Sequence, residues 1–372
     1  MKGFMEKRRD EYAVQDTRSG DSRQLSQDQD SPAKVTGFRR LDSSEDVSSE
    51  SGVDRTVDNT ELSRQTTLAE IAMLGSHDSG TYNVERHKPV SVCQHLDLTE
   101  QAKHGVQYFD LRVRKSDDSD WQFYHGEKKW FMAGYNATGS ATRELSKLFD
   151  FAKQNPRQLF IFKFHFDKHT NDSDEIGNFL QQEVVEKLKD NLIPNREGTG
   201  LGEVTLENSV YRGKNIGILA HYAEKSIEEN STLKEYVYKY KENTRGGWGN
   251  TPKDQELIQH ITKNIAEDSG EGKRGRILTS QTNLPAFVPN VHKAIFMPKT
   301  YRGLEHLAAK SHANVAQGVE RAITDDEGNV VRNPGVMSMD FVGTEAASTD
   351  YYAELRDKAN ALKKKEIETT RL

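Results

Sequence analysis

The hydrophobic positions of this chain form short apolar runs that are separated by segments of helical periodicity. The runs that predict strands are 71–74, 106–114, 121–124, 159–166, 216–221, 277–279 and 336–342. Apolar residues at helical spacing predict helices over 96–104, 176–192 and 307–319, a helix that includes 145–152, and a helix that follows the turn at 246–252 and ends near 266. Strands that alternate with helices in this way indicate parallel strands joined by right-handed crossovers.

Seven such runs, with an eighth missing or irregular, predict an α/β fold of the TIM barrel type, distorted or incomplete. A doubly wound sheet is the alternative. Residues 1–62 are rich in Ser, Asp, Glu, Gln and Arg, and we expect them to form a disordered N-terminal tail. We assign residues 63–345 to the barrel and 346–372 to a charged C-terminal helix.

Composition narrows the class of function. The net charge of -6 gives no general attraction for nucleic acid, so we expect no nucleic-acid partner. The single cysteine, Cys93, excludes an intramolecular disulfide. The N-terminus is basic but is followed by no apolar region, and no segment is long enough to span a bilayer. We therefore expect a chain that is cytoplasmic or exported without a cleavable signal peptide.

Ionisable side chains gather where five of the predicted strands end. They are His77 and Asp78, Asp110 and Arg112, His125, Lys163 and His165, and Asp340. In a barrel these strand ends meet at one mouth. Histidines with carboxylates suit general acid and base chemistry, and an arginine suits a phosphate group. Without a nucleophile elbow or a phosphate-binding loop, this set favours phosphoryl transfer over acyl transfer.

Four segments in the same order resemble the X domain of phosphatidylinositol-specific phospholipase C, nearest the bacterial and X-domain-only members. They are Leu74–Thr81, Phe109–Arg112, Tyr124–Gly126 and Met339–Val342. The resemblance covers roughly residues 66 to 345 and implies a distorted TIM barrel. It also implies that the inositol 2-hydroxyl attacks phosphorus, which releases diacylglycerol and leaves a cyclic inositol phosphate. The expected partner is phosphatidylinositol or a related phospholipid at a membrane surface.

The resemblance gives each motif residue a role. His77 is expected to be the general base, oriented by Asp340. His125 is expected to be the general acid, supported by Asp78. Arg112 would stabilise the phosphate charge.

Other residues are expected to hold the substrate. Asp110 would tether the site, and Lys163 matches a position that contacts inositol hydroxyls. Arg212 is a second candidate for such a contact. Trp248, in a segment similar to one of X-domain-only members, would stack on the sugar. His165 is counted with these substrate-binding residues.

The same positions bear on metal use. Calcium-dependent relatives have an Asn after the first His and a Glu-x-Asp pair on the second strand, where this chain has Asp78, Asp110 and Arg112. Because a guanidinium replaces a ligand, we expect no metal and no other cofactor. A zinc or calcium site of His77, Asp78 and His125 is the alternative.

Two other functions stay open, namely cleavage of another lipid head group and a catalytically silent lipid-binding module. A basic and aromatic loop at 128–132 suits either a membrane interface or packing beneath the barrel. The sequence leaves the oligomeric state open.

Overall fold

The structure, a computed structural model, describes residues 54–85, 88–116, 120–126, 135–167, 172–267, 275–285 and 303–370. The chain divides into two units, Met1–Ser49 and Glu50–Leu372, and all the described residues belong to the second. Residues 1–53 of the tail predicted over 1–62, and the loop at 128–132, lie outside the described residues.

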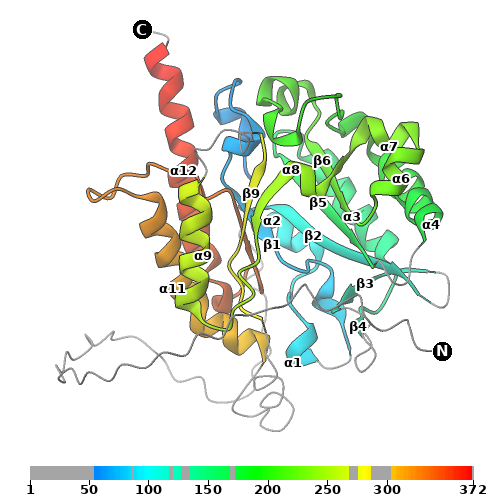
Figure 1. Cartoon of the computed structure of the whole chain (residues 1–372), viewed down its shortest axis with the longest axis horizontal. Helices are drawn as coiled ribbons and strands as arrows, with labels where there is room; N and C mark the ends of the chain where they lie inside the picture. Colours follow the sequence, from blue (N-terminus) through cyan, green and yellow to red (C-terminus); the bar gives the residue numbers. More distant parts are fainter. Residues whose placement is uncertain are drawn as a thin grey trace, which may run out of the picture. The chain divides into compact units, whose positions relative to one another are not determined.

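Within the described residues, eight parallel strands form one curled sheet, which confirms the predicted incomplete barrel (Figure 1). Their order in the sheet is β7-β6-β5-β2-β1-β10-β9-β8. The strands are β1 Met73–Ser76, β2 Val106–Lys115, β5 Phe160–Phe166, β6 Ile216–His221, β7 Val237–Lys239, β8 Thr244–Gly247, β9 Ile277–Gln281 and β10 Val336–Met339. The central strands β5 and β6 are buried along almost their whole length, as parallel strands covered by helices require.

The sheet is open between β7 and β8, the two strands that the sequence did not predict. They are joined only by the single turn α8, Tyr240–Asn243. Parallel neighbours need a crossover of about a dozen residues. Four residues cannot return the chain to the start of a parallel partner, so β7 pairs only with β6, and β8 only with β9, among the described strands.

The predicted strand at 121–124 is not a barrel strand, which corrects its place in the expected set of seven. β3, Trp121–His125, runs antiparallel to the end of β2, with Val113 opposite Phe123. A short β4, Tyr135–Asn136, extends this ribbon. The reversal occurs because β2 continues past the barrel and the chain folds back along it. The return brings His125 to the mouth of the barrel.

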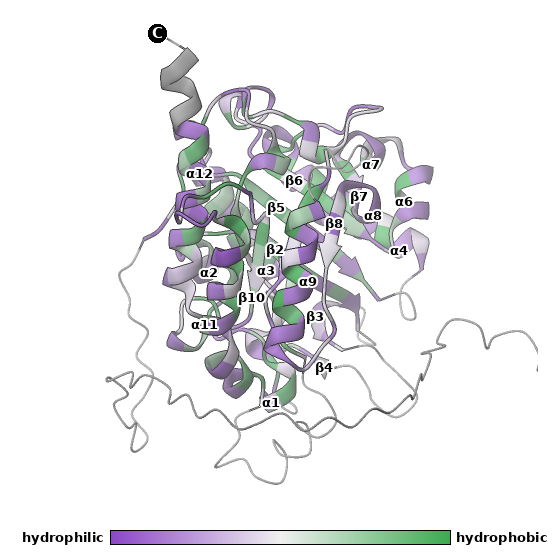
Figure 2. Ribbon diagram, turned by 60° about the vertical axis from the view of Figure 1, so that its left-hand side comes forward, coloured by the Kyte–Doolittle hydropathy of each residue, from purple (hydrophilic) through white to green (hydrophobic). Residues whose placement is uncertain are grey.

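Helices surround the sheet and turn their polar faces outward (Figure 2). They are α1 Lys88–Ser91, α2 Leu98–Lys103, α3 Ala141–Gln154, α4 Ser173–Asn178, α5 Glu186–Leu188, α6 Glu224–Glu229, α7 Ser231–Tyr236, α9 Asp254–Ala266, α11 Leu304–Ile323 and α12 Thr349–Thr370. A π-helical segment, Phe179–Val185, joins α4 to α5. Helix α3 buries Leu145, Leu148, Phe149 and Ala152, the positions that its periodicity predicted.

Both ends of the described chain pack on the barrel. Residues 54–62 were placed in the tail, yet Leu62 is buried and the Arg55 amide donates to the Lys103 carbonyl at 2.8 Å. The folded unit therefore starts before residue 63. At the other end, the Asn360 amide of α12 bonds to both the N–H and the C=O of Ala72. No described helix combines the length and apolar character needed to cross a membrane.

Candidate active site

His77 lies directly after β1 and forms the centre of the candidate site. Its Nδ1 is 2.8 Å from Oδ1 of Asp340, which follows β10, and its Nε2 is 2.8 Å from Nη2 of Arg112 on β2. A guanidinium can only donate, so Nε2 accepts and Nδ1 carries the proton that it gives to Asp340. Burial lowers the pKa of His77, but the carboxylate of Asp340 raises it by more than burial lowers it. The pKa of His77 therefore lies above its ordinary value.

The loop after β1 is held rigidly. The side chain of Gln94 donates to the carbonyls of His77 and Met339, and its oxygen accepts the Val342 N–H at 3.0 Å. Asp78 has a φ of 45°, a left-handed conformation that is uncommon outside glycine. These contacts fix the chain where it leaves β1, so the directions of His77 and Asp78 are set by the backbone.

Arg112 joins the carboxylates of two strands. Its Nε is 2.7 Å from Oδ1 of Asp78, and its Nη2 is 3.2 Å from Oδ2 of Asp110. The alternation of β2 places Asp110 and Arg112 on the same face, as predicted. Asp110 lies opposite Lys163 in the register of β2 with β5, and Lys163 Nζ is 2.7 Å from its Oδ1.

The charges around Asp110 decide its protonation. Burial alone raises the pKa of this carboxyl, but the cations of Lys163 and Arg112 outweigh burial and hold the pKa well below the ordinary value. Asp110 is therefore an anion that anchors two cations at the mouth of the barrel. Its ion pairs leave Arg112 with a defined orientation toward His77.

His125 faces Asp78, with its Nε2 at 3.5 Å from Oδ2. Burial, together with the positive charges of Arg112 and His77, lowers the pKa of His125 to about 3. Burial raises the pKa of Asp78 to about 6, although Arg112 and His77 oppose this rise. At neutral pH His125 is thus an uncharged imidazole beside a carboxylate.

A second group of rings lies at the ends of β5, β6 and β7. Nδ1 of His165 is 3.3 Å from Nδ1 of His221, and the His221 ring stacks on Tyr222 with centroids 3.9 Å apart. Lys163 Nζ lies 4.7 Å from the centroid of the Tyr240 ring. Burial and the charge of Lys163 lower the pKa of His165 to about 2 and that of His221 to about 4. These rings form an uncharged aromatic wall beside Lys163.

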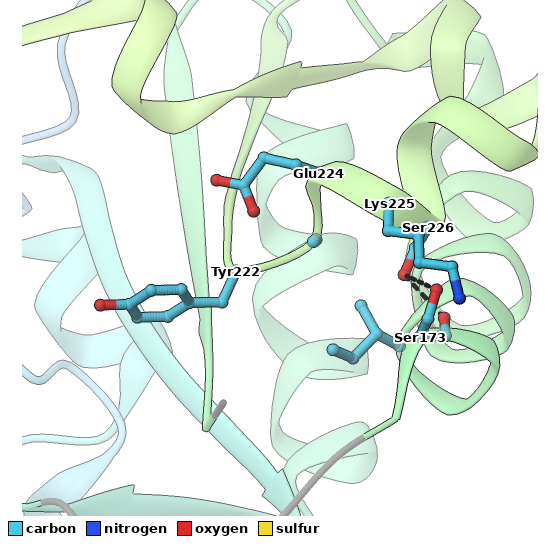
Figure 3. Close-up of a pocket in the computed structure, with 7 residues that line it drawn as sticks. Ser173, Tyr222, Glu224, Lys225 and Ser226 are labelled. Carbon is cyan, nitrogen blue, oxygen red and sulfur yellow. Dashed lines mark hydrogen bonds between the residues drawn. The ribbon is translucent and has the colours of Figure 1, made fainter. Parts of the chain in front are cut away.

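A hollow of about 250 Å³ lies beyond this wall (Figure 3). It is lined by Ser173, Ile176, Tyr222, Ala223, Glu224, Lys225 and Ser226. Figure 3 shows the Tyr222 ring pointing away from Ser173 and Ser226. The hollow contains none of the residues that surround His77, and Tyr222 is its link to the wall.

Two predicted binding residues are placed very differently. Trp248 follows β8 at the carboxyl ends of the strands and has 44% of its surface exposed. Arg212 is exposed in a short 3₁₀ helix that precedes β6. It lies at the amino end of β6, about 20 Å from the end that carries His221, at 3.3 Å per residue. The structure does not bring Arg212 to the site.

Sequence reasoning missed several residues of the site. The other site residues were found by a strand-end rule, namely that polar side chains at the carboxyl ends of barrel strands meet at one mouth. His221 ends β6 and Asn283 follows β9, so the same rule also points to them. Asn283 Nδ2 lies 3.3 Å from Nδ1 of His77. Gln94 lies in a loop with no sequence signal.

No family model matches the chain. The chain is 30% identical over 112 residues to 1-phosphatidylinositol phosphodiesterase of Listeria monocytogenes, which is 29% of this chain and 32% of that protein. It is 24% identical over 221 residues to the human PI-PLC X domain-containing protein 1, which is 52% of this chain and 62% of that protein. The chain thus spans from about a third to three fifths of the length of these curated relatives.

Solved structures extend the likeness in fold. The phosphatidylinositol-specific phospholipase C of Listeria monocytogenes has a TM-score of 0.53 at 19% identity, covering 79% of this chain and 96% of that one. A mutant of the Staphylococcus aureus enzyme has a TM-score of 0.56 at 14% identity, covering 80% and 97%. The resemblance predicted from the four motifs is confirmed: the chain is similar in sequence to these phosphatidylinositol phosphodiesterase and PI-PLC X domain-containing proteins, and it shares the fold of bacterial phosphatidylinositol-specific phospholipase C.

Proposed function

We propose that this chain is a phosphatidylinositol-specific phospholipase C. In this proposal the inositol 2-hydroxyl attacks phosphorus, diacylglycerol leaves, and an inositol cyclic phosphate forms. The observation that carries it is the position of His77, whose Nε2 faces the Arg112 guanidinium at 2.8 Å while Asp340 accepts from Nδ1. A base directed at a phosphate-binding cation is the arrangement that activates a hydroxyl beside phosphorus.

His77 takes the proton of the 2-hydroxyl, and the imidazolium that forms is stabilised by Asp340. The guanidinium of Arg112 rotates to donate its N–H groups to the phosphate oxygens and neutralises the charge that develops there. The turn breaks the contact between Arg112 and His77 and so exposes the lone pair of the base. Substrate binding and activation of the base are thereby one event.

His125 gives a proton to the glycerol oxygen that leaves. In the free protein the pKa of His125 is about 3, because burial and the cations of Arg112 and His77 disfavour its charge. A bound phosphodiester brings a negative charge that offsets Arg112, and Asp78 lies 3.5 Å away to stabilise the imidazolium. His125 therefore acquires its proton in the complex.

Lys163 contacts inositol hydroxyls from its ion pair with Asp110, and His165 lies beside it on β5. Trp248 covers the sugar from the end of β8. We propose that the reaction needs no metal, because the Arg112 guanidinium already contacts Asp78 and Asp110 at 2.7 and 3.2 Å, where calcium would require those oxygens. The proposed substrate lies in a membrane surface, which the protein contacts peripherally.

Phosphorus NMR of phosphatidylinositol vesicles in excess chelator tests this function. A cyclic phosphate signal supports both the proposed reaction and its metal independence. Cleavage that returns only with calcium contradicts the role of Arg112. Intact lipid under both conditions, with cleavage of a different phospholipid, indicates another head group, and binding without cleavage of any lipid indicates a silent module.

A further inference from the structure

Three side chains of the kinds that bind metal ions meet at the candidate active site. Ligand atoms of His77, Asp78 and Cys93 all lie within 4.8 Å of one another, and all three residues are buried. The position of Cys93 is fixed by its backbone, since its N–H donates to Thr81 Oγ1 at 3.2 Å and its C=O accepts the Phe341 N–H at 2.7 Å. The thiol is thus held against the base and its neighbouring carboxylate.

A second observation also points to a ligand. Asp78 is completely buried, yet neither of its oxygens accepts a well-oriented hydrogen bond from the described residues. Its neighbours are the charge contacts with Arg112 and His125. Because only these charge contacts hold the two oxygens, Zn²⁺ can coordinate Asp78 by displacing Arg112.

The donor set selects the kind of metal. Sulfur, imidazole nitrogen and one carboxylate are the ligands of zinc, whereas calcium and magnesium require several oxygens. With zinc–ligand bonds of about 2.0–2.3 Å, ligand atoms at a tetrahedral ion lie about 3.3–3.8 Å apart. The three side chains must therefore close by at most about 1 Å from the 4.8 Å limit to bind one zinc ion.

The local charge balance also suits a cation. Asp78, Asp110 and Asp340 face only two permanent cations, Arg112 and Lys163, within the ion pairs of the site. Zinc binding would remove the Cys93 thiol proton to solvent and leave a thiolate, so the bound site gains one net positive charge. Arg112 would give up its contacts with His77 and Asp78 and swing toward the mouth of the barrel.

We propose that His77, Asp78 and Cys93 form an inhibitory zinc site, with water as the fourth ligand. Zinc coordinates the lone pair of His77, the proposed base, and binds the Asp78 carboxylate that otherwise faces His125. With zinc bound, His77 cannot accept the proton of the 2-hydroxyl and His125 cannot donate one to the leaving oxygen. Binding needs only these three side chains, whereas inhibition also rests on the proposed phospholipase function.

The experiment is a titration of the metal-free full chain with Co²⁺, a spectroscopic substitute for zinc. Because Cys93 is the single cysteine, a thiolate-to-cobalt charge-transfer band reports on this site alone. We expect a band that saturates at one equivalent and that Zn²⁺ abolishes. The absence of the band in wild type overturns the site, whether or not the protein cleaves lipid.

Activity provides the second measurement. Cys93→Ala should keep the activity of wild type without metal and should require at least about tenfold more Zn²⁺ for half inhibition, since it loses one of three ligands. Cys93→Ser serves if the alanine variant fails to fold. His260→Gln, which changes a histidine of α9 far along the chain, should remain as zinc-sensitive as wild type. Equal sensitivity of the Cys93 variants and wild type overturns the proposal.

Discussion

Nη2 of Arg112 lies 2.8 Å from Nε2 of His77, so the group proposed to bind phosphate also covers the group proposed to act as base. This contact defines the tautomer of His77, because a guanidinium leaves Nε2 only the role of acceptor. It also means that the base is occupied until an anion attracts Arg112.

Asp340→Asn should lower turnover about 10²–10⁴-fold, the range of one positioned acid or base. In wild type the rate rises with pH as His77 loses its proton. Because Asp340 raises the pKa of His77, this acidic limb of the pH–rate profile lies above the ordinary histidine pKa. Without that charge the limb should move to lower pH. Initial rates of cyclic phosphate formation from pH 5 to 9 measure this, with the exposed Asp350→Asn as the control. A limb that stays in place contradicts the pairing.

Arg112→Lys should lower turnover about 10²–10³-fold, although the charge is kept. A lysine ammonium cannot contact Asp78, Asp110 and a phosphate with the planar fork that the guanidinium provides. The rate on phosphatidylinositol vesicles measures the effect, and Arg143→Lys on the exposed face of α3 is the matched control. Equal rates for the two variants would mean that only charge matters at residue 112.

The strand-end rule explains how much of this site the sequence could reveal. His77, Asp110, Arg112, Lys163 and Asp340 all lie in or directly after apolar runs, and the fold brings those ends together. The same argument excludes Arg212, because a residue that precedes its strand lies at the amino end of the barrel, away from the mouth where the carboxyl ends meet. Strands β7 and β8 were missed because three and four residues carry too little periodicity.

Contacts between distant segments were beyond the sequence for a different reason. Gln94 joins the carbonyls of His77 and Met339, which are 17 and 245 residues away from it. A glutamine in a loop is ordinarily a solvated side chain, and only the packing of β1 beside β10 gives it these partners. The reversal of β3 was hidden similarly, since its residues read as a normal strand.

Asp110→Asn should destabilise the fold by about 3–5 kcal/mol, because it leaves the buried Lys163 without its carboxylate partner. The pKa of Asp110 lies well below its ordinary value, so its contribution is present above an unfolded pKa of about 3.9 and is lost as pH falls through the folded pKa. Urea unfolding at pH 7 and pH 3 measures both effects, and the difference from wild type should shrink at pH 3. The exposed Asp150→Asn should change stability by less than about 0.5 kcal/mol. Equal stability of the two variants would show that Asp110 is not an anchor.

Asn360→Ala tests whether α12 belongs to the barrel or is a separate charged helix. Its side chain bonds to both the N–H and the C=O of Ala72 at 2.9 and 3.0 Å, just before β1. Loss of the amide leaves two buried backbone groups without partners, which should cost about 1–3 kcal/mol in the free energy of unfolding. Urea unfolding measures this, and Lys358→Ala on the exposed side of α12 is the control. If α12 were a separate helix, the two variants would unfold at the same urea concentration as wild type.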